Sequence, residues 1–366
     1  MSSWRLAAAV PAHAQRLADL LPVRVDATEL LTGRAGLLGL PAPGRVSAGG
    51  ASRLLPARDG WVAVTLSRPD DVAAVPALLE VEHVAEDPWP AVAAWAATRS
   101  AAEVTARARL LGLPAAVPGE APPAPPVVRS LSPPAPPRPL ADVLVVELAS
   151  LWAGPLCGRL LAQAGATVIK VESPARPDGT RAGSAAFFGW INAGKLSYAI
   201  DLDDRNLRAL LAVADVVIEG SRPAALARRG LGPGDTAARD GRVWVRVTGH
   251  GSAGDRGQWV AFGDDAAVAG GLVAMRDGEP GFCGDAIADP LTGLQAALSV
   301  VESLGRGGGE LLELSMAAVA ATYAALPCGG EVELTPRVPA TGDAGPALGA
   351  HQAVVQRIVQ SRCVAC

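Results

Sequence analysis

Between residues 143 and 249 the chain alternates short aliphatic runs with stretches that have the spacing of amphipathic helices. The aliphatic runs are VLVVEL (143–148), TVIKVE (167–172), SYAIDL (197–202), DVVIEG (215–220) and RVWVRVTG (242–249). Helical spacing is present in residues 154–165 and 204–214. Nearly continuous aliphatic strands separated by helices indicate a parallel sheet covered on both faces. We therefore predict an α/β fold with a Rossmann-like sheet, in which ligands bind at the carboxyl ends of the strands.

A dinucleotide-binding site does not fit the first turn of this predicted sheet. That turn reads ASLWAGPLCG (149–158) and lacks the pattern G-x-G-x-x-G, although Glu172 ends the second strand as an acidic residue would in such a site. An acidic strand end alone is a weak signal. The sequence does not favour binding of NAD or FAD.

Proline divides the chain into two parts. Residues 119–139, GEAPPAPPVVRSLSPPAPPRP, are predicted to form a semi-extended linker. Residues 1–118 are predicted to form a small α+β domain, with two strands in 53–66 around a turn at Asp59-Gly60 and a mostly helical stretch over 87–112. A glycine loop, SAGGAS (47–52), precedes these strands. Residues 140–366 are predicted to form the Rossmann-like domain.

Composition excludes several classes of function. The net charge of -4 gives no reason to expect nucleic acid as a partner. No apolar run approaches the ~20 residues that span a membrane, and the short N-terminal apolar run is interrupted by Pro11, so export is not favoured. The scattered cysteines fit a reduced, cytoplasmic setting. The lone CxxC formed by Cys363 and Cys366 lacks the second pair that a zinc site normally needs, so no metal is predicted.

The stretch CGDAIADPLTG (283–293) raises a question about its second aspartate. Apolar residues recur every three or four positions downstream of Asp289, so a helix is expected to start here. Asp followed by Pro is a common helix start, because Asp is a favoured N-cap and Pro suits the first helical position. A carboxylate held ionised at a helix N-terminus is also a nucleophile. The residues alone leave both interpretations open.

Several stretches resemble the family III CoA-transferases, which include formyl-CoA:oxalate and carnitine CoA-transferases and the related α-methylacyl-CoA racemases. In chain order they are VVELASLWAGPLCGRLLAQAGATVIKVESP, NAGKLSYAIDL, ADVVIEGSRPAALARRGLG, VRVTGHG and IADPLTGLQAAL. SAGGASRLLPARDGWVAV (47–64) is similar to the segment in which the family's glycine loop leads into its small domain. In the family the small domain follows the nucleotide-fold domain, so this chain resembles a rearranged member.

The resemblance implies that Asp289 is the catalytic nucleophile, because the family's aspartate lies in a stretch like IADxxxG and Gly293 matches its glycine. Asp285 stands where the family usually has an uncharged residue. The implied activity is CoA transfer from an acyl-CoA to a carboxylic acid through an aspartyl-acyl anhydride. Gly49 and Gly50 are implied to cover the site. Coenzyme A enters as part of a substrate rather than as a permanent cofactor, and the family implies a homodimer.

The resemblance also implies a cradle for coenzyme A along the carboxyl ends of the strands. Lys195 and Arg228 can pair with phosphates there. Apolar side chains of the first turn can pack the pantetheine or the adenine. The implied binding residues are Leu151, Trp152, Ala153, Asn192, Lys195, Gly220, Ser221 and Arg228.

Two alternatives stay open. A racemase of the same family uses a histidine, in a stretch like GHD, together with the aspartate that matches Asp289. Here the corresponding stretch is FGDD, with Asp264 at the position of the histidine, and His250 in TGHG matches a different landmark. The unusual domain order also allows a non-catalytic CoA-binding member of the family.

Overall fold

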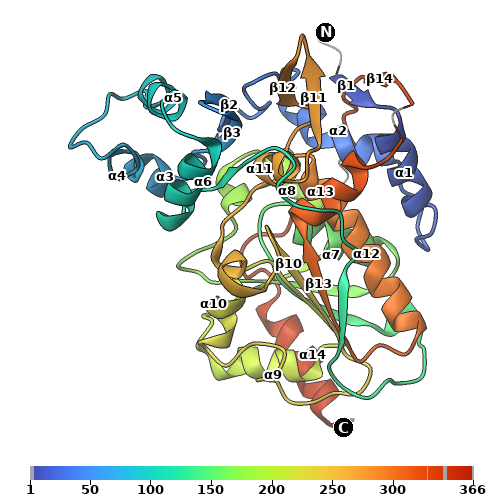
Figure 1. The fold of residues 1–366 in the computed structure, drawn as a ribbon. Helices are drawn as coiled ribbons and strands as arrows, with labels where there is room; N and C mark the ends of the chain where they lie inside the picture. Colours follow the sequence, from blue (N-terminus) through green and yellow to red (C-terminus); the bar gives the residue numbers. More distant parts are fainter. Residues whose placement is uncertain (1–3, 328, 341–343, 365–366) are drawn as a thin grey trace.

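The computed structural model describes residues 4–327, 329–340 and 344–364. Its largest element is a seven-stranded sheet in the spatial order β5-β13-β10-β9-β6-β7-β8 (Figure 1). All of these strands except β5 run parallel. They are β6 (Leu144–Leu148), β7 (Thr167–Glu172), β8 (Leu196–Ala199), β9 (Val216–Glu219), β10 (Val243–Thr248) and β13 (Glu310–Ser315). The predicted α/β fold is confirmed, although the third strand ends three residues earlier than its apolar run.

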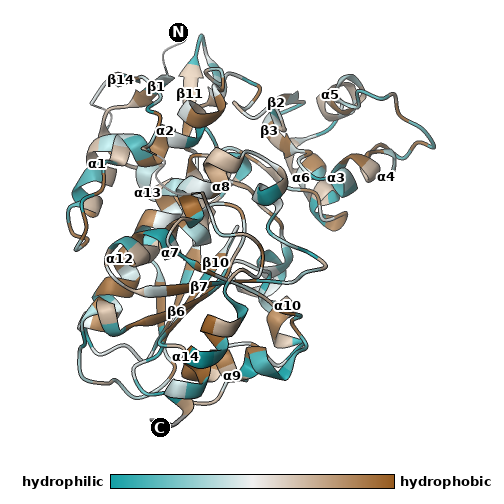
Figure 2. Ribbon diagram, turned by 180° about the vertical axis from the view of Figure 1, so that it is seen from behind, coloured by the Kyte–Doolittle hydropathy of each residue, from teal (hydrophilic) through white to brown (hydrophobic). Residues whose placement is uncertain are grey.

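The strands are apolar on both faces because helices cover both faces. Val145 and Val168 belong to one core with helices α7 (Ala153–Gln163) and α12 (Ala288–Gly305). The next residues, Val146 and Ile169, belong to a second core with α9 (Arg205–Val213), α10 (Pro223–Ala227) and α14 (Gln352–Val364). This alternation is the two-residue period of a strand. Figure 2 shows the resulting brown colour of β6 and β7.

The N-terminal segment packs with the sheet domain. Helices α1 (Ala9–Ala18) and α2 (Ala27–Leu38) share the core that contains α12. Strand β1 (Trp4–Ala7) pairs with β14 (Glu331–Leu334). Beside them are α8 (Ala185–Asn192), α11 (Gly263–Ala269), α13 (Met316–Ala324) and the hairpin of β11 (Val273–Arg276) and β12 (Glu279–Phe282). The packing therefore does not follow the expected boundary at residue 118.

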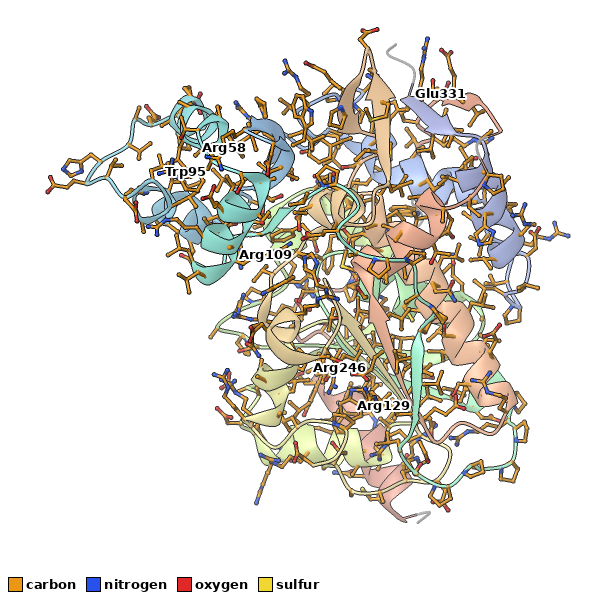
Figure 3. The ribbon with its side chains drawn as sticks, in the orientation of Figure 1. Arg58, Trp95, Arg109, Arg129, Arg246 and Glu331 are labelled. Atoms are coloured by element: carbon orange, nitrogen blue, oxygen red, sulfur yellow. The ribbon has the colours of Figure 1, made fainter. Side chains whose placement is uncertain are left out.

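A smaller α+β unit, residues 52–116, extends from this body (Figure 1). Strands β2 (Ser52–Ala57) and β3 (Gly60–Thr65) form the expected hairpin, with the turn one residue earlier than predicted because Ala57 pairs with Gly60. The unit also contains α3 (Pro69–Ala73), α4 (Val75–Leu79), α5 (Trp89–Ala97), α6 (Ala101–Leu110) and β4 (Ala115–Ala116). Arg109 of α6 lies where the unit meets the body (Figure 3), and its guanidinium lies 3.9 Å from the ring centroid of Trp259.

The proline-rich segment is extended as expected, but it is not a free connection. Its residues Val127–Ser130 form β5, which pairs antiparallel with β13 at one edge of the large sheet. At the other edge, the side chain of Gln352 donates to Ala199 O at 2.8 Å and accepts from Ala199 N at 3.0 Å. A neighbouring side chain, His351, accepts a hydrogen bond from Ser197 N at 3.0 Å. Both edges of the sheet are thus covered.

Helices α7 and α12 pack unusually closely, and Gly293 is the reason. A Cβ atom at Gly293 would lie 2.7 Å from Ala153 O and 2.8 Å from Leu156 Cβ. Real Cβ atoms do not approach other atoms so closely, so only glycine allows this separation of the two helices. The glycine of the IADxxxG stretch is therefore a packing residue that brings the start of α12 to the start of α7.

Two glycines of α12 give a matched test of this contact. We expect Gly293→Ala to lower the free energy of unfolding by about 1–3 kcal/mol, because the added methyl overpacks the helix interface. Gly305→Ala meets nothing within 4 Å and is expected to raise stability by up to about 1 kcal/mol through helix propensity. Urea denaturation of both variants measures the difference, and equal stabilities would contradict the close-packing argument.

Candidate active site

Asp289 lies in the first turn of α12 and does not cap the helix. The helix begins at Ala288, its N-cap is Ile287, and Asp289 is the second helical residue. The N-cap interpretation of Asp289 is therefore wrong. The Asp-Pro pair is shifted two positions into the helix, and the aspartate side chain is free to take part in other interactions.

The carboxylate of Asp289 lies at the N-terminus of a second helix. The backbone N–H of Ala153, the first residue of α7, faces it and lowers its pKa. A Cβ atom at Gly263, the first residue of α11, would lie 2.3 Å from Asp289 Oδ2. Asp289 is half-buried, between the fully buried residues Ala288 and Pro290. The positive end of the α7 dipole stabilises a negative charge at this position.

Three further aspartates surround Asp289. Burial, together with the neighbouring carboxylates, raises the pKa of Asp289 to about 7 and that of Asp264 to about 6. Burial raises the pKa of Asp265 to about 8 and also raises that of Asp285. Carboxyl groups removed from water and placed together cannot all ionise near neutral pH. Protons are therefore shared among the members of this cluster.

Arg34 of α2 is the cation that faces the cluster, and the sequence analysis missed it. It forms an ion pair with Asp285 and its charge also lowers the pKa of Asp289. Its guanidinium lies 5.6 Å from the ring centroid of Phe187 and 5.9 Å from that of Trp152. In the sequence Arg34 is a single basic residue in an ordinary helix, and no local pattern marks it.

The glycine loop lies beside this cluster. Ser47 Oγ accepts from Ser52 N at 3.1 Å, and Ser52 Oγ donates to Asp264 Oδ2 at 3.1 Å. Gly49 and Gly50 are exposed, and Gly50 has φ of 79°, a backbone conformation that glycine adopts without strain. A Cβ atom at Gly49 would lie 3.7 Å from Arg34 Nη2. The chain thus brings its predicted covering loop to the same place as Asp289.

The predicted cradle residues of the first turn lie near Asp289, but with different degrees of exposure. Leu151 is 40% exposed and Trp152 is buried, with its ring 5.3 Å from Phe187 in an edge-to-face contact. The Trp152 ring is thus part of the core, so the expectation that it packs pantetheine or adenine is corrected. Ala153 is buried, and its backbone N–H faces Asp289 as described above.

The turn after β9 is next to this first turn. A Cβ atom at Gly220 would lie 3.3 Å from Ala149 Cβ. Ser221 Oγ is buried without a hydrogen-bond partner within the described ranges. Arg228 directly follows α10 and is exposed. The binding of coenzyme A by these three residues stays a prediction.

Lys195 and Asn192 do not reach this edge, which corrects the expectation that Lys195 pairs with phosphates. Lys195 is 2% exposed, and its Nζ donates to Glu147 Oε2 at 2.8 Å, to Pro155 O at 2.7 Å and to Asn192 Oδ1 at 2.9 Å. Asn192 is fully buried. All three protons of the ammonium group have partners inside the protein. Both residues support the fold beneath α7.

Other candidate features lie outside this site. Burial lowers the pKa of His250 to about 4, so its ring is neutral, and the ring packs edge-to-face on Trp259. A cavity of about 700 Å³ lies between the turn after α1 and α7, and none of the site residues above lines it. No group of His, Cys, Asp and Glu in the described part of the chain could hold a metal ion. Cys363 is exposed, and Cys366 lies outside the described residues.

The helices of residues 4–327, 329–340 and 344–364 include none that is long and apolar enough to cross a membrane.

Known proteins that resemble this chain match about half of it. The chain is 34% identical over 200 residues to succinyl-CoA–D-citramalate CoA-transferase of Chloroflexus aurantiacus, covering 50% of each chain. It is 31% identical over 182 residues to human succinyl-CoA:glutarate CoA-transferase, covering 46% of this chain and 42% of that one. A CaiB/BaiF family protein from Brucella suis matches with a TM-score of 0.47 and 31% identity, over 52% of this chain and 56% of that one.

The chain spans about half the length of the curated relatives that it matches. The model of the family described as CoA-transferase family III matches residues 140–355, which is more than half of the chain and contains β6 to β14, Asp289 and the predicted cradle. The chain belongs to CoA-transferase family III.

Proposed function

We propose that this chain moves coenzyme A between an acyl-CoA thioester and a carboxylic acid, with Asp289 as the nucleophile. One observation carries the proposal: Asp289 is half-buried beside a second carboxyl group, Asp264, with its carboxylate facing the backbone N–H of Ala153 at the N-terminus of α7. Once it is ionised, a carboxylate held in this way can attack a carbonyl carbon directly, and no separate base is needed. Membership of the family supports the same reaction.

The proposed reaction begins with attack of an Asp289 oxygen on the thioester carbonyl. The tetrahedral intermediate collapses with cleavage of the C–S bond, which gives an acyl-aspartyl anhydride and CoA thiolate. The acceptor carboxylate then exchanges with the donor acid on the aspartyl group and releases the donor as a carboxylate. Thiolate attack on the acceptor acyl carbon forms the new thioester and regenerates the Asp289 carboxylate. No water is consumed, so the energy of the thioester is retained.

The surrounding groups have separate roles in this proposal. Arg34 provides positive charge beside the carboxylates and can bind an incoming acid. The loop at Gly49 and Gly50 covers the reacting atoms and excludes water, which would hydrolyse the anhydride. Coenzyme A lies along the carboxyl edge near Leu151, Ser221 and Arg228. The names of two relatives contain succinyl-CoA. We therefore propose succinyl-CoA as the first donor to test.

A racemase remains the second candidate, because Asp264 and Asp289 are two carboxyl groups in one site. Both oxygens of Asp264 already have partners: Oδ1 accepts from Ala286 N at 2.9 Å and Oδ2 accepts from Ser52 Oγ. Both bonds stabilise the ionised form of Asp264 and so lower its pKa, which makes it a weaker base for an α-proton. This geometry favours transfer.

The homodimer stays a prediction that rests on the family. Light scattering at micromolar concentration measures it, and a monomer would contradict it.

We expect a covalent adduct on Asp289. Intact-protein mass spectrometry after incubation with a panel of acyl-CoAs, succinyl-CoA included, should show an added acyl group, mapped to Asp289 by peptide analysis. Asp289→Asn should lose the adduct and lower transfer by at least about a thousandfold, while circular dichroism and CoA affinity stay unchanged. Asp285→Asn is the matched control and should still form the adduct. A folded, fully active Asp289→Asn protein would rule out this nucleophile.

The rate of transfer should fall at acid pH. Only the ionised form of Asp289 attacks, and its pKa is raised to about 7. The rate should therefore be constant above about pH 8 and fall about tenfold per pH unit below about pH 6. A pH profile at saturating acyl-CoA measures this limb. A rate that stays constant down to pH 5 would show that the nucleophile is not a carboxyl group with a raised pKa.

We expect no exchange of the α-proton of 2-methylacyl-CoA with solvent. Proton NMR in deuterated water, without an acceptor acid, should show an unchanged α-proton signal. Exchange that is lost in Asp264→Asn would overturn the assignment as a transferase in favour of a racemase.

A further inference from the structure

Four charged side chains are buried together beneath α7. They are Glu147 of β6, Lys170 of β7, Asp178 and Lys195, each at most 2% exposed. Lys170 Nζ lies 3.3 Å from Glu147 Oε1 and 2.8 Å from Asp178 Oδ2. Lys195 Nζ lies 2.8 Å from Glu147 Oε2. We call these residues the buried tetrad. Two cations and two anions balance its charge.

The buried tetrad binds the main chain of the turn that leads into α7. Lys170 Nζ donates to Ala149 O at 3.1 Å. Asp178 accepts the Leu151 N–H on both carboxylate oxygens at 3.2 Å. Lys195 Nζ donates to Pro155 O at 2.7 Å. These contacts hold the main chain at three places: before the bend at Ala149, at the bend itself at Leu151, and after the bend at Pro155.

The bend requires such support. Leu151 has φ of 72°, in the left-handed region that a leucine rarely adopts, and such a residue persists only where its surroundings hold it. Helix α7 also lies directly on the tetrad, because a Cβ atom at Gly158 would lie 2.0 Å from Glu147 Oε2. Any displacement of the tetrad therefore moves the start of α7.

Two residues after Leu151 is Ala153, whose carbonyl oxygen would lie 2.7 Å from a Cβ atom at Gly293 of α12, so the start of α7 lies directly against the helix of Asp289. The N–H of Ala153 faces the Asp289 carboxylate. We propose that the buried tetrad is a positioning device for the proposed reaction: through Asp178 and the Leu151 bend it holds the Ala153 N–H beside the Asp289 carboxylate. The four residues do not touch substrate. They act through the backbone of the turn, and the proposal rests on Asp289 being the nucleophile.

A role in stability alone explains the tetrad poorly. Buried ion pairs repay their desolvation cost only with good geometry, and apolar replacements are often as stable. Each tetrad member outside Glu147 instead uses one of its bonds to hold a main-chain atom of the same turn. The specificity of these bonds is what an apolar core cannot supply.

The test measures the pKa of Asp289 in the complete chain. Aspartate labelled with ¹³C at Cγ gives a titration curve for Asp289, assigned from the signal that disappears in Asp289→Asn. In Asp178→Asn we expect the midpoint to rise by about one pH unit, because the Ala153 N–H no longer favours the ionised form. Loss of a neighbouring negative charge alone would lower the midpoint. The sign of the shift therefore separates the two effects.

Asp215→Asn is the matched control. Asp215 is also fully buried and ion-paired, but it precedes β9 at the other end of the strands and accepts the Leu144 N–H at 2.8 Å. The Asp215→Asn variant should be less stable than the wild type, but the midpoint of the Asp289 titration should be unchanged. The charged groups that face Asp289, namely Asp264 of α11, Asp285 and Arg34 of α2, are intact in both variants.

Thr180→Val covers the case in which Asp178→Asn does not fold. Thr180 Oγ1 donates to Asp178 Oδ1 at 2.7 Å and is only partly buried, so its loss loosens Asp178 mildly. We expect a smaller shift in the same upward direction. An unchanged or lowered midpoint in the folded variants would overturn the positioning role.

The midpoint does not depend on turnover, so the two proposals fail separately. If the wild type is inactive but the midpoint rises in Asp178→Asn, the proposed transferase activity is contradicted and the positioning role of the tetrad is supported. If the wild type is active but the Asp289 midpoint is the same in Asp178→Asn, only the positioning role of the tetrad is contradicted. In an active enzyme, the acid limb of the rate profile should move with the NMR midpoint.

Discussion

The position of α7 is the constraint on which the site depends. On one side the helix rests on buried charges, where only the absence of a side chain at Gly158 allows Glu147 to approach. On the other side α12 presses against it at Gly293. Close-packed interiors transmit such contacts rather than absorb them. The start of α7, and with it the Ala153 N–H, therefore has little freedom relative to the carboxylate of Asp289.

Much of the fold could be predicted because its signals are local. Strands β6, β7, β9 and β10 are near-continuous aliphatic runs, and such runs need cover on both faces. That α1 and α2 pack with the sheet domain could not be predicted, since both helices have apolar faces that suit any core. Only the contacts with α12 show which core they join. Similarly, a stretch of prolines indicates extended chain but not that four of its residues pair with β13.

The site could be predicted in part, and the reason differs from residue to residue. Asp289 stands in a recognisable stretch, so its position could be inferred before the geometry was known. The family resemblance implied that Lys195, which directly precedes β8, pairs with phosphates. Its buried location follows from the partner Glu147, which is distant in sequence. A charged residue inside an aliphatic run, as in VLVVEL and TVIKVE, is the signal that could have revealed Glu147 and Lys170. Arg34 had no comparable signal.

The covered edges of the sheet have a consequence for how the molecule meets others of its kind. An open strand edge is a template for further strands, and proteins with such edges join into fibrous aggregates. Here one edge carries a short strand flanked by prolines, which cannot donate to a growing ladder. At the other edge, the side-chain amide of Gln352 occupies the backbone groups of Ala199 in the way that an added strand would. The two edges therefore offer little free backbone for a second copy to extend the sheet, and assembly through helices and loops is favoured.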